Sequence, residues 1–140
     1  MFAAHLRVRF EDVDYAQVVY FPNLFGYCHN VFEDFFEREV GALYATMLRE
    51  RRVAFPSVHA EADFKKPLRF GDRVRIELDV VSVGRTSIRS RYRVFPDEGA
   101  ELLAELSIVT AAISLDTFES IEIPPDVRAA FSRHLASGGV

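Results

Sequence analysis

The segment from residue 23 to residue 40 constrains the fold more than any other part of the chain, because it predicts one long helix. Its apolar side chains recur every three or four residues, the spacing that gathers them on one helix face. They are Leu24, Cys28, Val31 and Phe35, flanked by Phe25, Phe32 and Phe36. Either Pro22 or Asn23 can begin this helix, and Gly41 can end it. So bulky an apolar face has to be covered by the rest of the chain.

Patterns of alternating apolar and polar residues predict strands with one buried face on both sides of this helix. A strand, the long helix and then about four antiparallel strands make an α+β domain in which the sheet wraps the helix. The free edges of such a sheet are places where a second copy can pair. The strand segments are 6–10, 53–64, 73–80, 88–94 and 102–115, and short helices are expected at 42–50 and 126–136.

Composition excludes several classes of protein. A chain of 140 residues, 49% hydrophobic and 27% charged, fits one globular domain spanning residues 1–140. We see no membrane-spanning run or signal peptide and expect a cytoplasmic protein without membrane insertion. Cys28 is the one cysteine, so no internal disulfide forms. A net charge of −4 argues against nucleic acid as the main partner.

The stretch FEDVDYAQVVYFPN, residues 10–23, places two aspartates directly before an apolar run and a helix start. If the strand continues, Asp12 and Asp14 point to one face, and if it breaks into a turn they diverge. As turn residues they would serve only local hydrogen bonds, which is the favoured interpretation for Asp12. Asp14 precedes a helix end with free N–H groups, so it is a candidate base or nucleophile beside an oxyanion site.

The segment RVRFEDVDYAQVVYFPNLF resembles the signature of the 4-hydroxybenzoyl-CoA thioesterase family of hotdog-fold proteins. The resemblance continues through VAFPSVHAEADFKKPLRFGDRV and VGRTSIRSRY, and so covers nearly the whole chain. YCHN and SVHAEADF are similar to two subgroups, the 1,4-dihydroxy-2-naphthoyl-CoA hydrolases and the short-chain acyl-CoA thioesterases. The resemblance implies an antiparallel sheet wrapped around one central helix, and it does not choose between these subgroups.

The same resemblance implies roles for individual residues. Asp14 matches the catalytic carboxylate, which attacks the thioester or activates water, and the N–H of Phe21 matches the group that polarises the thioester carbonyl. Tyr20 and Asn23 would surround the substrate. Arg85 matches a position that contacts coenzyme A phosphates in some members, and Thr86 beside it stands where a basic residue is found in those members.

Gln17 departs from the family pattern, which has glycine before Val-Val-Tyr. If this position requires a positive φ, Gln17 strains or reshapes the loop. Alternatively, its side-chain amide reaches the substrate.

Several other residues could carry chemistry. Cys28 and His29 point about 100° apart on a helix, which argues against a shared metal ion, so no metal site is expected. His59 lies on a strand and would either line the pocket or serve as a core or interface histidine. Glu33 is a candidate through resemblance alone, because a helix carboxylate lines the active site in a sister group of hotdog proteins. Arg89, Arg91 and Arg93 form a row that pairs with Glu77 and Asp79 across strands or guides anionic coenzyme A.

The sequence therefore predicts a thioesterase that hydrolyses an acyl-CoA or aroyl-CoA. No cofactor is expected, because coenzyme A is part of the substrate. The pocket should lie between two subunits of a homodimer or homotetramer. Two alternatives remain open: a hydratase-type hotdog protein, which needs a paired histidine and acid near the helix start, and a non-catalytic acyl-CoA-binding protein.

Overall fold

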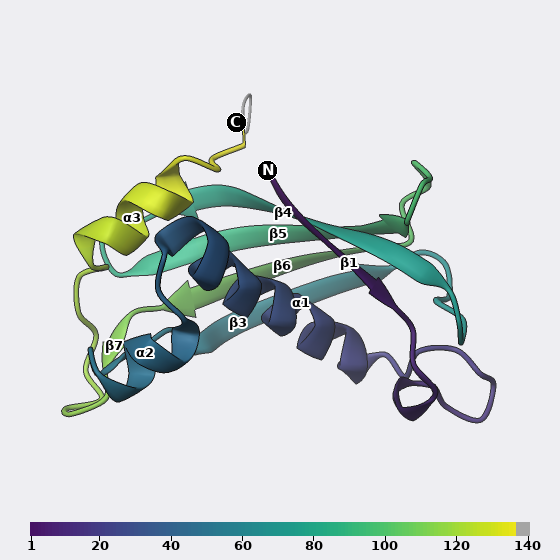
Figure 1. The fold of residues 1–140 in the computed structure, drawn as a ribbon, viewed down its shortest axis with the longest axis horizontal. Coiled ribbons are helices and arrows are strands. Elements are labelled where there is room, and N and C mark those ends of the chain that lie inside the picture. Colours follow the sequence, from purple (N-terminus) through teal and green to yellow (C-terminus); the bar gives the residue numbers. More distant parts are fainter. Residues whose placement is uncertain (137–140) are drawn as a thin grey trace.

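The fold is a five-stranded antiparallel sheet curved around one long helix (Figure 1). The computed structural model describes residues 1–136. Its elements, in chain order, are β1 (Phe2–Arg7), the 3₁₀ turn η1 (Phe10–Asp12), α1 (Pro22–Phe35), the π-helical turn η2 (Phe36–Val40), α2 (Tyr44–Arg49), β2 (Val53–Ala54), β3 (Ser57–Phe64), β4 (Arg73–Val83), β5 (Ser87–Pro96), β6 (Ala104–Ala111), β7 (Ile113–Ser114) and α3 (Pro125–Ser132).

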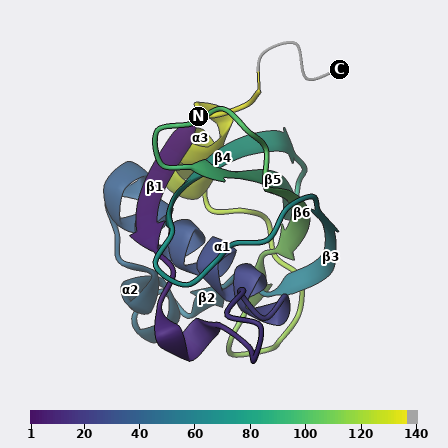
Figure 2. The same cartoon turned by 90° about the vertical axis from the view of Figure 1, so that its right-hand side faces the viewer.

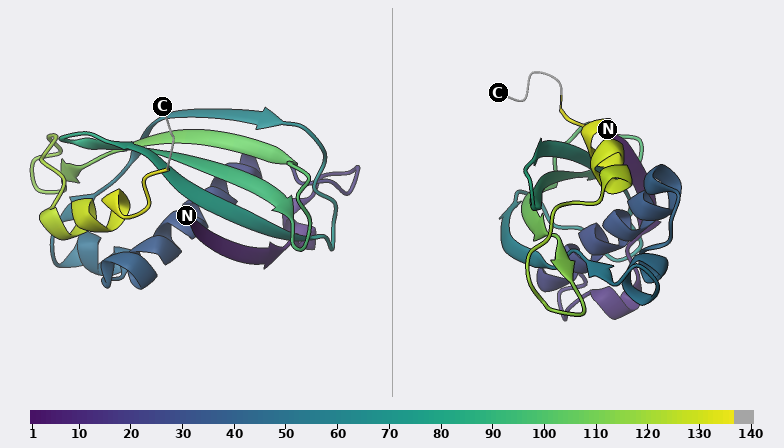
Figure 3. Two further views of the ribbon diagram at one scale, coloured as in Figure 1. Left: turned by 90° about the horizontal axis from the view of Figure 1, so that it is seen from above. Right: turned by 90° about the vertical axis from the view of Figure 1, so that its left-hand side faces the viewer.

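The strands of the main sheet lie in the order β1-β4-β5-β6-β3, so β1 and β3 are the two edges. Viewed along its length, the sheet curls around α1 (Figure 2). Seen from above and from the far end, α3 lies beside β4 at the end of the sheet opposite the loop that precedes α1 (Figure 3). β2 and β7 form a separate two-stranded pair at that same end.

The core forms where the alternating strands meet the apolar face of α1. On β4 the side chains of Val74, Ile76, Leu78 and Val80 are fully buried, while the intervening Arg75 and Glu77 are half-buried on the other face. Helix α1 contributes Leu24, Tyr27, Cys28, Val31, Phe32 and Phe35. Gly41 ends the helical segment with φ +82°, a left-handed conformation that glycine adopts without a Cβ clash. The α+β class and the wrapped helix are confirmed.

Four predicted boundaries were wrong. The segment 53–64 is two strands in different sheets, β2 and β3, because the Phe55 N–H donates to the Tyr44 hydroxyl and Pro56 has no N–H to continue the ladder. The first strand is Phe2–Arg7 rather than 6–10, because the chain breaks into η1 and leaves Phe10 74% exposed. The apolar run at 102–115 is two strands, β6 and β7, separated at buried Ala112, whose N–H donates to the Thr86 carbonyl and leaves the sheet ladder. The terminal helix is Pro125–Ser132 and so ends before residue 136.

Candidate active site

The chain between β1 and α1 turns back on itself in a tight loop around Asp14. The Asp14 N–H donates to the Val18 carbonyl at 2.9 Å, and the Gln17 N–H donates to the Asp14 carbonyl at 2.9 Å. Gln17 closes this turn with φ +63°. The family's glycine position therefore does require a left-handed backbone here, and Gln17 adopts it at a steric cost that glycine would avoid.

The two aspartates diverge, as expected for a turn. Asp12 Oδ2 accepts a hydrogen bond of 2.8 Å from the Tyr27 hydroxyl, and Asn23 Nδ2 donates to the Asp12 carbonyl at 2.9 Å. Burial and the bond to Asp12 raise the pKa of Tyr27. Asp12 thus ties the loop to the first turns of α1 through bonds to residues eleven and fifteen positions away, rather than through the local bonds expected of a turn residue. Asp14 is exposed, and its Oδ1 accepts the Ala16 N–H at 2.9 Å.

The start of α1 leaves one main-chain amide available. The N–H groups of Asn23 and Leu24 donate to the Tyr20 and Phe21 carbonyls at 2.8 and 3.2 Å, and Pro22 has no N–H. Within residues 1–136, the Phe21 N–H has no acceptor. It lies at the positive end of the helix dipole, where an anionic oxygen is stabilised.

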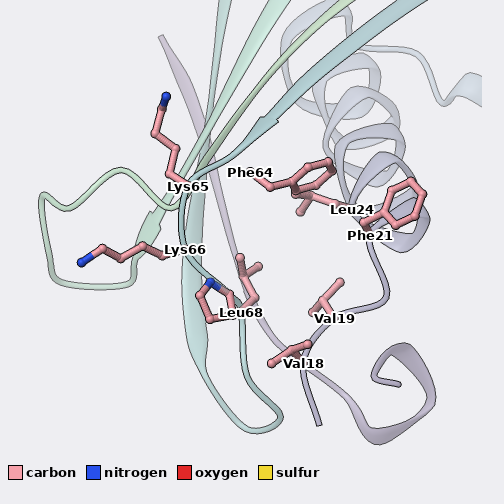
Figure 4. A pocket seen from close by; sticks show the side chains of 9 residues that line it. Val18, Val19, Phe21, Leu24, Phe64, Lys65, Lys66 and Leu68 are labelled. Carbon is pink, nitrogen blue, oxygen red and sulfur yellow. The ribbon is translucent and has the colours of Figure 1, made fainter. Parts of the chain in front are cut away.

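An apolar pocket of about 300 Å³ lies beside this amide. It is lined by Val18, Val19, Phe21, Leu24, Phe64, Lys65, Lys66, Pro67 and Leu68. In Figure 4 the side chains of Phe64, Leu24 and Phe21 face Val19, Val18 and Leu68, whereas both lysine side chains extend away from them. The Phe21 and Phe64 rings meet edge to face, with centroids 5.9 Å apart. The pocket is therefore a slot between the start of α1 and the end of β3.

A second pocket of about 390 Å³ continues along the same side of α1. Aromatic rings dominate its lining, which consists of Phe25, Gly26, His29, Phe32, Phe55, Ser57, Ala60, Tyr92, Ile108 and Thr110. Thr110 is 5% exposed, and its hydroxyl has no hydrogen-bond partner among the described residues. A buried hydroxyl without a partner is unfavourable, so a ligand atom that bonds to it gains affinity. We call the two pockets together the α1–β3 seam.

The predicted site residues around the helix start lie close together. Tyr20 and Phe21 are about half exposed, with ring centroids 5.6 Å apart. The Asn23 side-chain amide donates a hydrogen bond to the Asp12 carbonyl, so in the single chain Asn23 stabilises the loop. Asp14 does not line the first pocket, because its turn projects from the end of the molecule. Its role as the catalytic carboxylate stays a prediction.

The other predicted substrate contacts lie elsewhere. His59 is exposed on β3 and bonds to Glu61 at 2.7 Å, and Glu61 faces a shallow depression on the outer side of the sheet rather than the seam. Arg85 and Thr86 lie in the β4–β5 turn, at the opposite end of the sheet from Asp14 (Figure 1). Arg85 Nε donates to Glu122 at 3.0 Å, and the Thr86 carbonyl accepts the Ala112 N–H at 2.7 Å. One chain does not bring these residues to Asp14.

The remaining candidates are accounted for by their contacts. Cys28 is fully buried, and burial raises its pKa, whereas His29 is exposed and bonds to Glu33 at 3.1 Å. Arg93 pairs with Asp79 at 2.8 Å and Arg91 with the same carboxylate at 3.3 Å. Arg91 and Arg93 therefore pair across strands as expected, whereas Arg89 donates to the Ser107 hydroxyl at 3.3 Å instead of pairing with Glu77 or Asp79.

Two residues with evident roles were not predicted from the sequence. Tyr27, whose hydroxyl bonds the loop at Asp12, lies on the apolar face of the helix. A buried phenol needs a hydrogen-bond partner, and Asp12 was the nearest candidate in the sequence. Thr110 is a hydroxyl within an otherwise apolar stretch of β6, a signal that was present in SIVTAA.

Comparison with known proteins identifies the family. The model of the thioesterase-like superfamily matches residues 8–131. The chain belongs to the thioesterase-like superfamily. It is therefore a thioesterase, and the expected hotdog fold is confirmed.

Individual relatives of this thioesterase agree with the assignment. It is 30% identical to a 1,4-dihydroxy-2-naphthoyl-CoA hydrolase of Crocosphaera subtropica over 92% of this chain and 87% of the relative. A 1,4-dihydroxy-2-naphthoyl-CoA thioesterase from Synechocystis superposes with a TM-score of 0.86 at 27% identity, covering 94% of this chain and 95% of that one. A gentisyl-coenzyme A thioesterase gives a TM-score of 0.80 at 26% identity, covering 90% and 98%.

Proposed function

We propose that this thioesterase hydrolyses an aroyl-CoA or acyl-CoA thioester to the free acid and coenzyme A, as in the 4-hydroxybenzoyl-CoA thioesterase family. The observation that carries the proposal is the Phe21 N–H at the start of α1, beside the apolar seam, which has no acceptor in the described part of the chain. The named relatives act on coenzyme A thioesters of hydroxylated aromatic acids. Their names support the same class of substrate for this chain.

In the proposed mechanism the thioester carbonyl oxygen accepts the Phe21 N–H, and the developing negative charge is stabilised by this amide and the helix dipole. The Asp14 carboxylate either attacks the carbonyl carbon or removes a proton from the water that attacks it. The carbon–sulfur bond then breaks, and the coenzyme A thiolate leaves and takes up a proton. On the first route the acyl group is left as an anhydride on Asp14, which water hydrolyses to the free acid and the regenerated carboxylate. On the second route the attacking water gives the free acid directly. Neither route needs a metal or redox cofactor.

The α1–β3 seam supports an aroyl group over a simple aliphatic one. Its second pocket is walled by the rings of Phe25, Phe32 and Tyr92, which match the flat face of an aromatic acid. The Thr110 hydroxyl offers a buried hydrogen-bonding group to a ring hydroxyl. A site built to bond a substrate hydroxyl discriminates strongly against analogues that lack it.

Hydrolysis by the Asp14→Asn variant tests the proposal. General-base or nucleophilic catalysis by a side chain contributes about 10²- to 10⁴-fold to the rate, so we expect a loss of that size with unchanged folding. The assay follows release of free thiol from 4-hydroxybenzoyl-CoA, benzoyl-CoA and hexanoyl-CoA, and the hydroxylated substrate should be preferred. Asp34→Asn on the exposed face of α1 is the matched control and should retain full activity. Undiminished turnover by Asp14→Asn would remove Asp14 from the mechanism.

The same panel separates the two alternatives. A non-catalytic acyl-CoA-binding protein would release no thiol from any substrate. A hydratase would add water to an enoyl-CoA. His29 does pair with an acid, Glu33, but it lies two turns into α1 rather than at the helix start, so this pair does not favour a hydratase.

We also propose that the working form is at least a homodimer joined along β3. This edge strand has eight residues, seven of them exposed, and among residues 1–136 it pairs with β6 alone. β3 forms one wall of the seam. A second copy pairing with β3 would cover both pockets and place polar groups of the second chain beside the pockets of the first. A homotetramer, also predicted from the sequence, would join two such dimers through another face.

Placing a lysine on this edge tests the dimer. Val58 is 62% exposed on β3, and Val58→Lys should halve the mass measured by light scattering and lower activity. Leu43→Lys, at a similarly exposed aliphatic residue before α2, is the control and should leave both unchanged. A wild-type chain that is monomeric and fully active would contradict the proposal.

A further inference from the structure

The end of β1 and the start of β4 place two arginines directly opposite each other. Arg7 pairs in register with Arg73 in the antiparallel ladder, and Arg9 follows two residues later, where the strand has ended. All three residues are exposed. Like charges facing each other across two strands destabilise a sheet, so this arrangement costs free energy unless an anion lies between them.

The described residues supply no such anion. Arg7, Arg9 and Arg73 form no ion pair and no side-chain hydrogen bond within residues 1–136, whereas the neighbouring Arg75 bonds to Glu77 and three main-chain carbonyls. The carboxylate of Asp97 borders the cluster but pairs with His5. Glu11, next to the cluster, is exposed and unpaired in the same range, which leaves an excess of positive charge.

Two depressions lie beside these three arginines and share Arg7 and Arg9 in their linings, and we call them together the hollow. One depression of about 300 Å³ is lined by His5, Leu6, Arg7, Arg9, Arg73 and Asp97. A wider depression of about 840 Å³ shares Arg7 and Arg9, and Val8, Phe10, Glu11, Phe70 and Gly71 complete its lining. The Phe10 and Phe70 rings are 74% and 49% exposed and meet edge to face, with centroids 5.6 Å apart. Exposed ring faces therefore lie beside unpaired guanidinium groups.

We propose that this hollow is a nucleotide-binding site, in which Arg7, Arg9 and Arg73 bind phosphate and the Phe10–Phe70 pair receives the aromatic base. Guanidinium groups bind phosphate oxygens through two parallel charge-assisted hydrogen bonds. Bases stack on exposed aromatic side chains with little dependence on sequence. A phosphate between Arg7 and Arg73 would also pair with both guanidinium groups and so remove the repulsion between them.

Two sources share this chemistry: the nucleotide end of a coenzyme A thioester, and a free nucleotide that binds separately. Only the first rests on the proposed function. The hollow is built from β1, η1, the β3–β4 connection, the start of β4 and the residue after β5, and its lining shares no residue with the α1–β3 seam. The experiment therefore measures binding and hydrolysis separately.

Calorimetric titration with adenosine 3′,5′-bisphosphate and with inorganic pyrophosphate tests the site. The wild-type chain should bind both, and Arg7→Gln and Arg73→Gln should each weaken binding at least tenfold. Phe10→Leu should weaken binding of the nucleotide and leave that of pyrophosphate unchanged. Arg49→Gln, an exposed arginine on α2, is the control and should bind like the wild type. In the absence of ligand, Arg7→Gln should raise the melting temperature, because it removes the like-charge pair.

Kinetics then distinguish the sources. If the hollow holds the nucleotide of coenzyme A, Arg7→Gln raises KM for an aroyl-CoA and leaves KM for the matching N-acetylcysteamine thioester unchanged. If it takes a free nucleotide, neither KM changes although binding of the bisphosphate is lost. Wild-type chain that binds neither probe, or Arg7→Gln that binds as tightly as wild type, overturns the site. Chain that binds nucleotide but hydrolyses no thioester leaves the site standing and contradicts the proposed function.

Discussion

The two ends of the central helix differ in how completely their side chains are buried and their main-chain groups are hydrogen-bonded. At the C-terminal end, Phe35 and Phe36 are fully buried, and their rings lie 4.3 and 5.8 Å from that of Phe131. The same end is closed from outside by Arg133, which donates to the Glu39 carbonyl at 2.8 Å, and by His134, which pairs with the Glu39 side chain at 2.9 Å. This end of α1 is packed for stability.

The N-terminal end is left open instead. Tyr20 and Phe21 are half exposed, the Phe21 N–H has no acceptor within residues 1–136, and Gln17 holds a left-handed backbone. Strained or unsatisfied groups persist only where the surrounding structure holds them in place. The two ends of α1 therefore have different roles, which we call the division between the ends. The buried rings at the C-terminal end stabilise the fold, and this offsets the cost of the strained backbone and the exposed groups at the N-terminal end. Variants at both ends test that division.

The largest expected effect belongs to the packed end. Phe131→Ala should lower the free energy of unfolding by about 3–5 kcal/mol, because it removes a fully buried ring that contacts Phe32, Phe35 and Phe36. Urea denaturation measures this loss. Turnover per folded molecule should stay close to the wild-type value, since Phe131 lines neither pocket of the seam.

Phe118→Ala gives the matched control, because Phe118 is 71% exposed and loses the same side-chain atoms. Its free energy of unfolding should change by less than about 0.5 kcal/mol. Equal losses from the two variants, or a Phe131→Ala protein that folds but is inactive, would refute the division between the ends.

A smaller effect is expected where the loop is tied to the helix. Tyr27→Phe removes the hydroxyl that donates to Asp12, a bond to a charged group worth about 1.5–3 kcal/mol. We expect faster amide hydrogen exchange in residues 12–20 and reduced turnover, with exchange in α3 unchanged. Tyr15→Phe, at a fully exposed tyrosine of the same loop, should alter neither. Loss of protection in α3 as well would show that the ends are not independent.

The smallest effect is expected at Gln17. Replacing this left-handed residue by glycine relieves a steric cost of about 1–2 kcal/mol but adds chain entropy worth about 0.5–1 kcal/mol in the unfolded state. Gln17→Gly should therefore gain between about 0 and about 1.5 kcal/mol in urea denaturation, and the β-branched Gln17→Val should lose stability. A destabilised glycine variant would mean that the glutamine side chain makes a contact that outweighs the strain.

Much of the fold follows from periodicity. The spacing of apolar residues in 23–40 predicts α1, and the alternation in 73–80 and 88–94 predicts β4 and β5, because in each case one face alone is buried. Periodicity fails where it continues past the end of an element. Phe10 keeps the alternation of residues 6–10, yet its ring lies on the surface against Phe70, a contact set by the β3–β4 connection.

The candidate site was predictable only in part. Sequence locates Asp14 and Phe21 at the junction of loop and helix, since both are fixed by neighbours a few residues away. It does not show that Arg85 lies at the other end of the sheet, because that depends on the lengths of β4 and β5. Nor does it reveal the seam, which is formed by α1, β3, β5 and β6 together.

Among residues 1–136, no helix is both long and apolar enough to cross a membrane.

The π-helical turn η2 limits how this chain can change in length over evolution. The Gly41 N–H reaches back five residues to the Phe36 carbonyl at 3.0 Å, so the turn holds one residue more than a regular helix would. Deleting a single codon within 37–40 would restore regular geometry and rotate the chain beyond the turn by about 100°. The Tyr44 hydroxyl would then lose the hydrogen bond of 2.9 Å that it accepts from the Phe55 N–H, and the segment that leads into β3 would change direction. Descendants of this chain should therefore vary in length at surface turns and conserve it here.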